Sequence, residues 1–385
     1  MSVGSFQSAE RTGGEMIRGF LSVLGLALLF VVLWDAFETI VLPRRVSRRV
    51  RLARLFYRST WRLWAALGRR MPTSNRRDAF LSYYGPLSLL LLLAVWAAIL
   101  IVSFALLHWG FGTMLVGPDG PADFGGALYM SGGTFFTLGI GDITPHTTLG
   151  RLLTDVEAGT GIAFLALVIG YLPVIYQAFS RREASISLLD ARAGSPPTAA
   201  ELLRRHADGD SPEGLIQLLR DWERWSAELL ESHLSYPVLA YYRSQHDRES
   251  WLAALTMVLD VCALILVGIE GAPPRAARLT FAMARHAAVD LSQIFGTPPH
   301  MARADRLPPA DLVQLRAFLA DAGTPLRPGP EADQQLAAIR TQYEPYIHAL
   351  ADYLLDELPP WIPLPDSEDD WQTSSWEHTT RARPS

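Results

Sequence analysis

The sequence predicts an all-α membrane protein, and three observations lead to this prediction. First, 49% of the 385 residues are hydrophobic and only 19% are charged, whereas about a quarter of an average soluble domain is charged. Second, two stretches of more than 20 residues contain no Asp, Glu or Arg. Third, the C-terminal half reads as helical segments separated by Pro-rich breaks. A disordered chain is therefore excluded, and an ordinary soluble globule is disfavoured.

Residues 1–42 are expected to form an N-terminal segment that contains one membrane helix. The apolar run Gly19–Trp34 reaches Leu42 if Asp35 and Glu38 are accepted near its end. Those two carboxylates, and the lack of a small-residue cleavage site, argue against a secretory signal peptide.

Residues 43–83 are expected to form an Arg-rich amphipathic helix in the cytoplasm. The loop 43–77 carries twelve Arg and no acidic residue, so the positive-inside rule places it inside and the N-terminus outside. The arginines that recur every three or four residues are Arg44, Arg48, Arg51, Arg54, Arg58 and Arg62. Such a helix would bind anionic lipid along Arg44–Arg77. A voltage sensor and a plain topology signal are the alternatives, and the sensor lacks the acidic partner helices that it needs.

Residues 84–180 are expected to form a pore domain with two membrane helices, Tyr84–His108 and Ala158–Ser180. The segment between them faces the exterior and includes the turn-rich stretch 117–121. The apolar stretch Gly125–Leu138 is too short to cross the membrane, so a re-entrant helix is predicted there.

The re-entrant stretch leads into a motif that suits ion coordination. Its residues are Thr137, Leu138, Gly139, Ile140, Gly141 and Asp142. Glycine accepts left-handed backbone angles without penalty, so alternating conformations can turn successive carbonyl oxygens to one side. Four such loops around an axis would form oxygen rings that replace the water shell of a cation. Asp142 would supply negative charge at the outer mouth.

Together with the helices on either side of it, this motif makes residues 84–180 resemble the pore module of two-transmembrane potassium channels. The family filter reads Thr-Val-Gly-Tyr-Gly-Asp, and this one reads Thr-Leu-Gly-Ile-Gly-Asp. The resemblance implies an outer helix, a pore helix, a filter and an inner helix, arranged in a homotetramer. It also implies that residues 137–141 form the filter, in which the carbonyls of residues 137–140 and the Thr137 hydroxyl bind K⁺. Gly161 falls where the family often has a hinge glycine, and Pro173 predicts a kink.

One residue of the filter departs from the family pattern. Ile140 replaces an aromatic residue whose hydroxyl, in the family, bonds the surrounding pore helices. The backbone carbonyls remain, so K⁺ coordination is expected to survive, but the filter loses a lateral tether. Potassium selectivity is therefore the expectation, and a weakly selective cation pore is the alternative.

Residues 181–364 are expected to form an all-helical cytoplasmic domain, followed by a disordered acidic tail at residues 365–385. The predicted helices are Thr198–His206, Pro212–Ser232 with a continuation to Gln245, Pro274–Phe295, Pro309–Ala322 and Glu331–Glu357. The apolar segment Trp251–Ile269 is either a helix buried in this domain, which we favour, or a fourth membrane span.

The sequence offers no catalytic or cofactor signature. Cys262 is the only cysteine, so neither a disulfide nor a Cys-based metal site can form. There is no phosphate-binding or dinucleotide-binding glycine motif. We therefore expect a non-enzyme whose ligand is permeant K⁺, with no nucleic-acid partner. A membrane-anchored scaffold with an inactive pore module remains the alternative from another class.

Overall fold

The computed structural model describes residues 3–42, 51–71, 74–207, 213–244, 250–301 and 304–364. The chain divides into two compact units. Unit 1 comprises residues 1–62 and 86–176, and unit 2 comprises residues 63–85 and 177–385. Arg44, Arg48 and the expected acidic tail lie outside the described residues.

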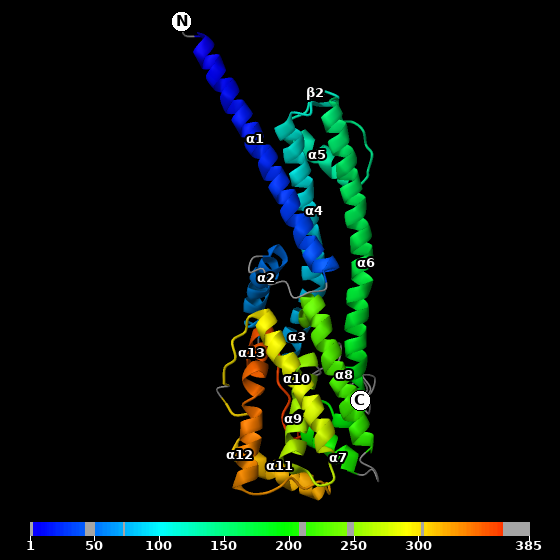
Figure 1. The fold of residues 1–385 in the computed structure, drawn as a ribbon, viewed down its shortest axis with the longest axis vertical. Helices are drawn as coiled ribbons and strands as arrows, with labels where there is room; N and C mark the ends of the chain where they lie inside the picture. The colour runs from blue at the N-terminus through cyan, green and yellow to red at the C-terminus, as the bar shows by residue number, and fades with distance from the viewer. Residues whose placement is uncertain are drawn as a thin grey trace, which may run out of the picture. The chain divides into compact units, whose positions relative to one another are not determined.

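Unit 1 is built mainly from long helices (Figure 1). Its elements are α1 (Val3–Ala36), a π-helix (Phe37–Val41), the first part of α2 (Leu52–Gly68), most of α4 (Tyr84–Phe111), β1 (Leu115–Gly117), β2 (Gly120–Pro121), α5 (Phe124–Phe135), β3 (Thr144–Pro145) and the first part of α6 (Thr148–Ala193). The long helices α1, α4 and α6 are each apolar enough to cross a membrane. The chain is therefore a membrane protein of predominantly helical structure.

Helix α1 lies against α4 through small residues. A side chain at Gly25 would place its Cβ 2.9 Å from the Ser103 carbonyl oxygen, and a side chain at Gly110 would place its Cβ 2.3 Å from Ser22 Oγ. Small residues of this kind allow membrane helices to approach closely where apolar burial alone gives no driving force. Most large apolar side chains of α1 are exposed in the single chain, as a lipid-facing helix requires.

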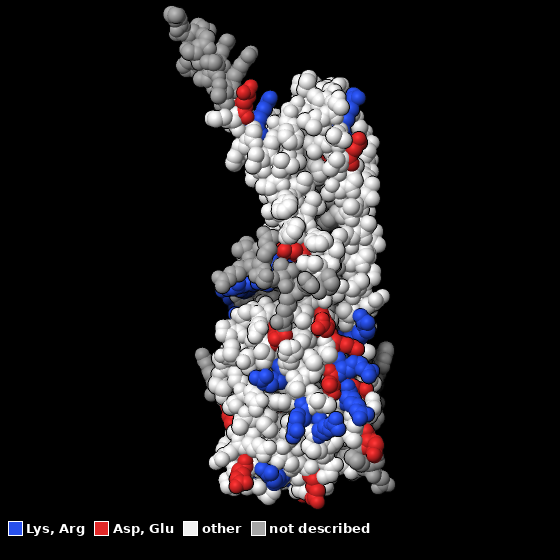
Figure 2. Space-filling view, viewed as in Figure 1, with Lys and Arg blue, Asp and Glu red and all other residues white. Residues whose placement is uncertain are grey.

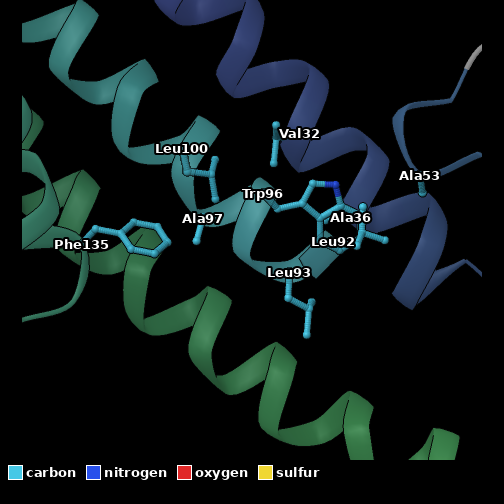
Figure 3. Packing of buried hydrophobic residues seen from close by; sticks show 9 residues of the cluster. All are labelled: Val32, Ala36, Ala53, Leu92, Leu93, Trp96, Ala97, Leu100 and Phe135. Carbon is cyan, nitrogen blue, oxygen red and sulfur yellow. The ribbon is translucent and has the colours of Figure 1, made fainter. Parts of the chain in front are cut away.

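A buried apolar cluster joins the helices of unit 1 (Figure 3). It consists of Val32, Ala36, Ala53, Leu92, Leu93, Trp96, Ala97, Leu100 and Phe135. These residues come from α1, α2, α4 and α5. Because Phe135 is the last residue of α5, the cluster fixes the end of the helix that leads into the filter.

The two carboxylates near the end of the first membrane helix have defined partners. Asp35 Oδ2 accepts hydrogen bonds from Trp96 Nε1 at 3.2 Å and from the Ala53 backbone N–H at 3.0 Å. Glu38 lies 3.6 Å from Arg51. Asp35 therefore satisfies a free N–H group at the start of α2 while it also bonds the outer helix α4.

A small antiparallel sheet interrupts the helical pattern that the sequence predicts. Its strand order is β2-β1-β3, and β1 pairs with β3 through Leu115–Pro145 and Val116–Thr144. The turn-rich stretch 117–121 forms the β1–β2 hairpin. Strands of two or three residues carry too little periodic pattern to be recognised in a sequence.

Unit 2 is a helical bundle. Besides the remaining parts of α2, α4 and α6, it contains α3 (Ser74–Ser82), α7 (Ala199–Ala207), α8 (Glu213–Ser235), the 3₁₀ helix η2 (Pro237–Tyr241), α9 (Trp251–Gly268), α10 (Pro274–Phe295), α11 (Pro309–Asp321), α12 (Pro330–Arg340) and α13 (Glu344–Leu354). Helix α7 begins as predicted, because the Thr198 hydroxyl accepts a hydrogen bond from the Glu201 backbone N–H at 3.3 Å. Helix α10 has the predicted bounds.

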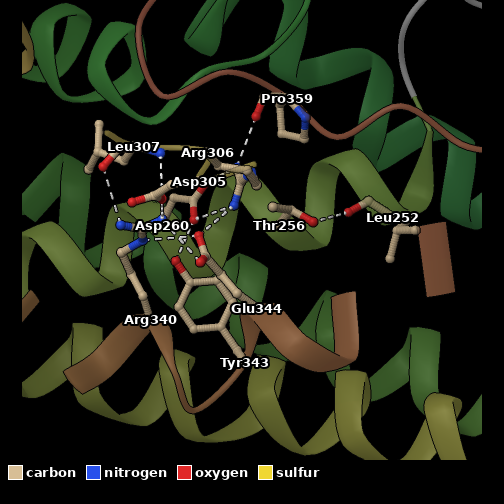
Figure 4. A network of polar contacts seen from close by, with 10 residues as sticks. All are labelled: Leu252, Thr256, Asp260, Asp305, Arg306, Leu307, Arg340, Tyr343, Glu344 and Pro359. Atoms are coloured by element: carbon tan, nitrogen blue, oxygen red, sulfur yellow. Dashed lines mark hydrogen bonds and ion pairs between the residues drawn. The ribbon is translucent and has the colours of Figure 1, made fainter. Parts of the chain in front are cut away.

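Helix α9 is the centre of this bundle. It is apolar enough to span a membrane, but 89% of it is buried inside the protein, and it packs against α7, α10, α12 and α13. This is the arrangement that the sequence favours over a fourth span. Its one charged residue, Asp260, accepts hydrogen bonds from Arg306 at 2.6 Å and from the Tyr343 hydroxyl (Figure 4). Asp260 is therefore a paired structural residue.

Two predicted helix bounds were wrong. The expected inner helix, Ala158–Ser180, is part of the much longer α6, which begins after Thr147 caps its first turn and continues to Ala193. The single helix expected over 331–357 is two helices, α12 and α13. Pro345 cannot donate a backbone hydrogen bond and would clash with the preceding turn, so the helix ends and restarts.

Helix α8 is also shorter than predicted. It ends at Ser235, and the expected continuation through Pro237 is the 3₁₀ helix η2.

Charged residues are distributed unevenly over the elements. The face shown in Figure 2 has few charges over α4, α5 and α6 of unit 1, whereas unit 2 shows basic and acidic residues together. An uncharged surface on the long helices fits contact with hydrocarbon.

Candidate functional site

The candidate site begins with the short helix α5, which has a defined start. Asp123 occupies the N-cap position, and its Oδ1 accepts a hydrogen bond from the Gly126 backbone N–H at 2.8 Å. The helix has 12 residues, which is shorter than a membrane span. The segment thus forms the helix that was expected between the outer and inner helices.

Helix α5 ends in a Schellman turn that sets the inner end of the filter. The Leu138 N–H donates to the Gly133 carbonyl at 2.8 Å, and the Thr137 N–H donates to the Thr134 carbonyl at 3.0 Å. This turn requires a left-handed residue after the cap, a position that glycine usually occupies. Thr137 takes it, with φ of 56°. A β-branched residue is strained there, by about 1–2 kcal/mol.

The backbone of the predicted filter, residues 137–141, alternates in conformation. Thr137, Gly139 and Gly141 have φ values of 56°, 64° and 76°, whereas Leu138 and Ile140 between them lie outside the left-handed region. The motif predicted left-handed angles at the glycines and did not identify Thr137 as a third such residue. Alternation of this kind is the backbone conformation that turns successive carbonyl oxygens to one side.

The outer end of the filter is attached to α5 and to the sheet. Asp142 lies beside the Tyr129 hydroxyl of α5 and accepts a hydrogen bond from the Ile143 N–H at 3.0 Å. The following strand β3 pairs with β1. These contacts supply a lateral tether at a different position from Ile140.

The inner helix supports the filter from the other end through Gly161. A Cβ at this position would lie 2.0 Å from the Phe135 carbonyl oxygen at the end of α5. A Cβ at Gly159, two residues earlier, would meet no atom within 4 Å. Gly161 therefore allows close contact between α6 and α5, which is the packing role that small residues have in membrane helices.

A buried polar cluster that the sequence did not identify joins the outer, pore and inner helices. Its members are His108 on α4, Ser131 on α5 and Glu157 on α6, each at most 1% exposed. His108 Nε2 lies 3.7 Å from a Glu157 carboxylate oxygen, and His108 Nδ1 lies 2.9 Å from Thr113 Oγ1. An ionisable residue inside a membrane helix indicates a functional role. The uncharged run in the sequence begins at residue 158, so Glu157 falls just outside the inner helix that the sequence predicts.

The flank of the filter is open in a single chain. A pocket of about 340 Å³ is lined by α5, the filter and the start of α6. Around it, Tyr129, Phe136, Leu138 and Ile140 are 48%, 58%, 63% and 56% exposed. Apolar residues in this number are seldom left exposed beside one another without a partner surface.

The remaining predicted site residues lie on α6 and α2. Pro173 lies within α6, and the helix continues through it, so the predicted kink stays a prediction. On α2, Arg54, Arg58 and Arg62 are exposed, while Ala53, Trp61 and Ala65 are buried. The exposed side of α2 therefore carries arginines, but Leu55, Leu63 and Leu67 are exposed as well, so the amphipathic helix expected over residues 43–83 stays a prediction.

Comparison with known proteins shows what the site is similar to. Residues 88–177 match a family model described as "Ion channel". This part of the chain is therefore similar to an ion-channel domain. The match covers α4 from its second turn, the sheet, α5, the predicted filter and most of the apolar part of α6, but it does not include α2.

A curated relative gives further support for a membrane protein. The chain is 25% identical over 191 residues to the "Uncharacterized membrane protein YdjJ" of Bacillus subtilis (strain 168), a match that covers 49% of this chain. It spans 55% of that relative's length. No solved structure matches the chain.

Proposed function

We propose that the channel domain conducts K⁺ selectively and passively as a homotetramer. The observation that carries this proposal is the alternation of left-handed residues at Thr137, Gly139 and Gly141. Four copies would stack carbonyl rings of Thr137, Leu138, Gly139 and Ile140, with Thr137 hydroxyls at the inner end, and these oxygens replace the hydration shell of the ion. Asp142 at the outer mouth raises the local concentration of cations.

The tetramer is supported by the exposed flank of the filter. One chain supplies one pore loop, and a closed ring needs several. Neighbouring copies would cover the pocket beside the filter and the exposed side chains of Tyr129, Phe136, Leu138 and Ile140. In the proposed orientation the N-terminus and the filter mouth face outside and unit 2 is cytoplasmic.

The Arg-rich segment is proposed to bind anionic lipid at the cytoplasmic leaflet. Arg54, Arg58 and Arg62 form the basic part of the exposed face of α2, and Leu55, Leu63 and Leu67 are exposed beside them. A helix with basic and apolar residues side by side lies in the membrane interface, with each Arg contributing about 1 kcal/mol near anionic headgroups.

Weak selectivity is the second candidate, and Ile140 favours it. Its side chain has no hydroxyl, so it cannot form the lateral hydrogen bond expected of the aromatic residue in two-transmembrane potassium channels. A filter with fewer lateral contacts is less rigid. The proximity of Asp142 to Tyr129 supports selective conduction, because it would restrain the filter two residues after Ile140.

Reversal potentials of the purified, reconstituted chain in opposing K⁺ and Na⁺ gradients test the proposal. We expect reversal at the K⁺ equilibrium potential; reversal near zero would favour a weakly selective pore. No current at any voltage would favour the scaffold alternative.

Gly139→Ala tests the filter assignment. Alanine at φ of 64° is strained by about 1–2 kcal/mol, so we expect assembled tetramers that pass no K⁺. Gly132→Ala on α5 is the matched control, because Gly132 has no positive φ and a Cβ there meets no atom within 4 Å. Undiminished K⁺ flux in Gly139→Ala would refute the assignment.

A further inference from the structure

Arg182, which follows the apolar part of α6, is buried in unit 2. Its side chain is 4% exposed, although the adjacent Arg181 is exposed. The guanidinium lies 5.2 Å from the centre of the Phe179 ring and forms an ion pair with Glu183 at 2.9 Å. A buried guanidinium is costly unless its donors are satisfied, so the remaining partners of Arg182 determine what it does.

Two of those partners are backbone carbonyls at the end of η2. Arg182 donates from Nη1 to the Leu239 carbonyl at 2.9 Å and from Nη2 to the Tyr242 carbonyl at 2.6 Å. The Leu239 carbonyl also accepts a hydrogen bond from the Tyr242 N–H at 3.1 Å, and carbonyl groups at a helix end carry partial negative charge. The planar fork of arginine can bind two such oxygens at once, which lysine cannot do in the same way. The inner helix is thus attached to the backbone of one short segment, Pro237–Arg243, which we call the coupling segment.

His233 on α8 completes the partners of Arg182. Its Nδ1 lies 2.8 Å from the Leu229 carbonyl, which can only accept, so Nδ1 carries a proton. Its Nε2 then presents a lone pair to Arg182 Nη1, 3.4 Å away. Burial, followed by the charge of Arg182, lowers the pKa of His233 to about 3, so the imidazole remains a neutral acceptor.

The coupling segment also holds the start of the outer helix. A Cβ at Gly85 would lie 2.7 Å from the Tyr242 ring, so α4 approaches the segment as closely as its backbone allows. The Tyr84 ring meets the Tyr241 ring edge-on at 5.0 Å. Both the inner helix and the outer helix therefore contact residues 239–242 within unit 2.

The same segment is joined to the interior of the bundle. Trp251 of α9 donates to the Ala240 carbonyl at 3.3 Å, and the Tyr241 hydroxyl lies 2.7 Å from that of Tyr353 on α13. Arg243 forms ion pairs with Asp78 of α3 and with Asp356, each at 2.9 Å. A displacement of α9 or α13 would therefore move the segment that holds both membrane helices.

We propose that Arg182 is a positioning residue that couples the gate to the bundle through the coupling segment. This inference rests on the proposed function, since it concerns opening and closing of that pore. Widening the cytoplasmic end of the pore requires the end of the inner helix to move relative to the outer helix. The coupling segment contacts both the inner and the outer helix. A ligand that binds one conformation of the bundle more tightly than the other therefore shifts the equilibrium between open and closed pores, by the difference between its two binding free energies.

Single-channel recording of the full-length protein in planar bilayers, with symmetrical K⁺, tests the coupling. In Arg182→Gln we expect the open probability to change at least about tenfold, while single-channel conductance and reversal potential stay at wild-type values. Arg182→Lys keeps the charge without the fork and should give an intermediate open probability. Arg181→Gln, which removes the same charge from the adjacent exposed position, should match the wild type.

A second variant covers the case in which Arg182→Gln fails to assemble. Tyr242→Leu keeps the backbone carbonyl that Arg182 uses and removes the ring that contacts Gly85 and lies 5.6 Å from the Phe179 ring. It should also change the open probability at unchanged conductance. Wild-type open probability in every assembled variant at these two positions overturns the coupling. A wild-type protein that passes no K⁺ overturns the proposed function, and the coupling with it.

Discussion

At the scale of single residues, the conformation of the filter depends on Thr137 as much as on its glycines. The motif predicted where Gly139 and Gly141 would adopt left-handed angles, because only glycine does so without strain. Thr137 could not be identified in this way, since a β-branched residue normally avoids that region. Its conformation comes from the end of α5, where the backbone bonds of Thr137 and Leu138 demand it.

The role of Gly161 can be separated from that of Gly159 by substitution. A methyl group at Gly161 meets the Phe135 carbonyl, and we expect Gly161→Ala to destabilise the assembled channel by about 1–3 kcal/mol. Gly159→Ala meets no atom within 4 Å and should be neutral or stabilising, because alanine gains up to about 1 kcal/mol of helix propensity over glycine. Thermal dissociation of purified tetramers measures both effects.

If Gly161 acts as the hinge that the sequence predicts, the same experiment should give a different result. A glycine needed only for bending would leave tetramer stability unchanged in Gly161→Ala and alter the gating alone. Equal dissociation temperatures for Gly161→Ala and Gly159→Ala would contradict the packing role.

At the scale of helices, starts were predictable where a residue marks them locally. The Thr198 hydroxyl that caps α7 and the Pro274 that begins α10 are visible in the sequence. Ends were harder to predict, because α6 continues for 13 residues past Ser180 on polar sequence that gives no membrane signal. The break before α13 has a local cause in Pro345, because the residue before a proline avoids the helical conformation.

The amphipathic helix α2 gives a prediction at this scale. Replacing Arg54, Arg58 and Arg62 together by Gln removes about 3 kcal/mol of attraction to anionic lipid. The affinity of the purified full chain for phosphatidylglycerol should therefore fall on the order of 100-fold at low salt, and less at high salt because ions screen the remaining charge. Titration with phosphatidylglycerol at two ionic strengths measures the change.

A matched control removes the same number of charges elsewhere. Arg220 and Arg224 on α8 and Arg278 on α10 are also exposed, and their replacement by Gln should leave lipid affinity unchanged. Equal losses in the two triple variants would show that net charge alone sets lipid binding, against a specific role for α2.

At the scale of the whole molecule, the distribution of charged residues along the chain was predictable, but the ion pairs that they form were not. Residues 1–77 contain 14 Arg and four acidic residues, whereas residues 181–385 contain 19 Arg and 29 acidic residues. That pattern supports an orientation. The ion pairs of unit 2 join residues far apart in sequence, such as Arg243 with Asp78 and Arg306 with Asp260. No local pattern encodes such pairs, since the tertiary fold creates them.

Unfolding of unit 2 should depend on pH through His233. Burial, and then Arg182, lowers the pKa of His233 to about 3, while in an unfolded chain it is about 6.5. Between these values the unfolded chain binds a proton that the folded chain does not. Stability is therefore fully present above about pH 6.5 and falls by about 1.4 kcal/mol per unit as the pH drops towards 3.

His233→Gln removes this contribution, so its stability should fall less between pH 7 and pH 5, by about 2 kcal/mol relative to wild type. The free energy of unfolding of the full chain in detergent, followed by the fluorescence of the buried Trp222, Trp225 and Trp251, measures it at each pH. His286→Gln, which removes an exposed histidine from the same bundle, is the control for loss of a histidine as such. Parallel pH profiles for His233→Gln and the wild type would show that the buried imidazole accepts a proton without unfolding, and the neutral acceptor assigned to it beside Arg182 would then be wrong.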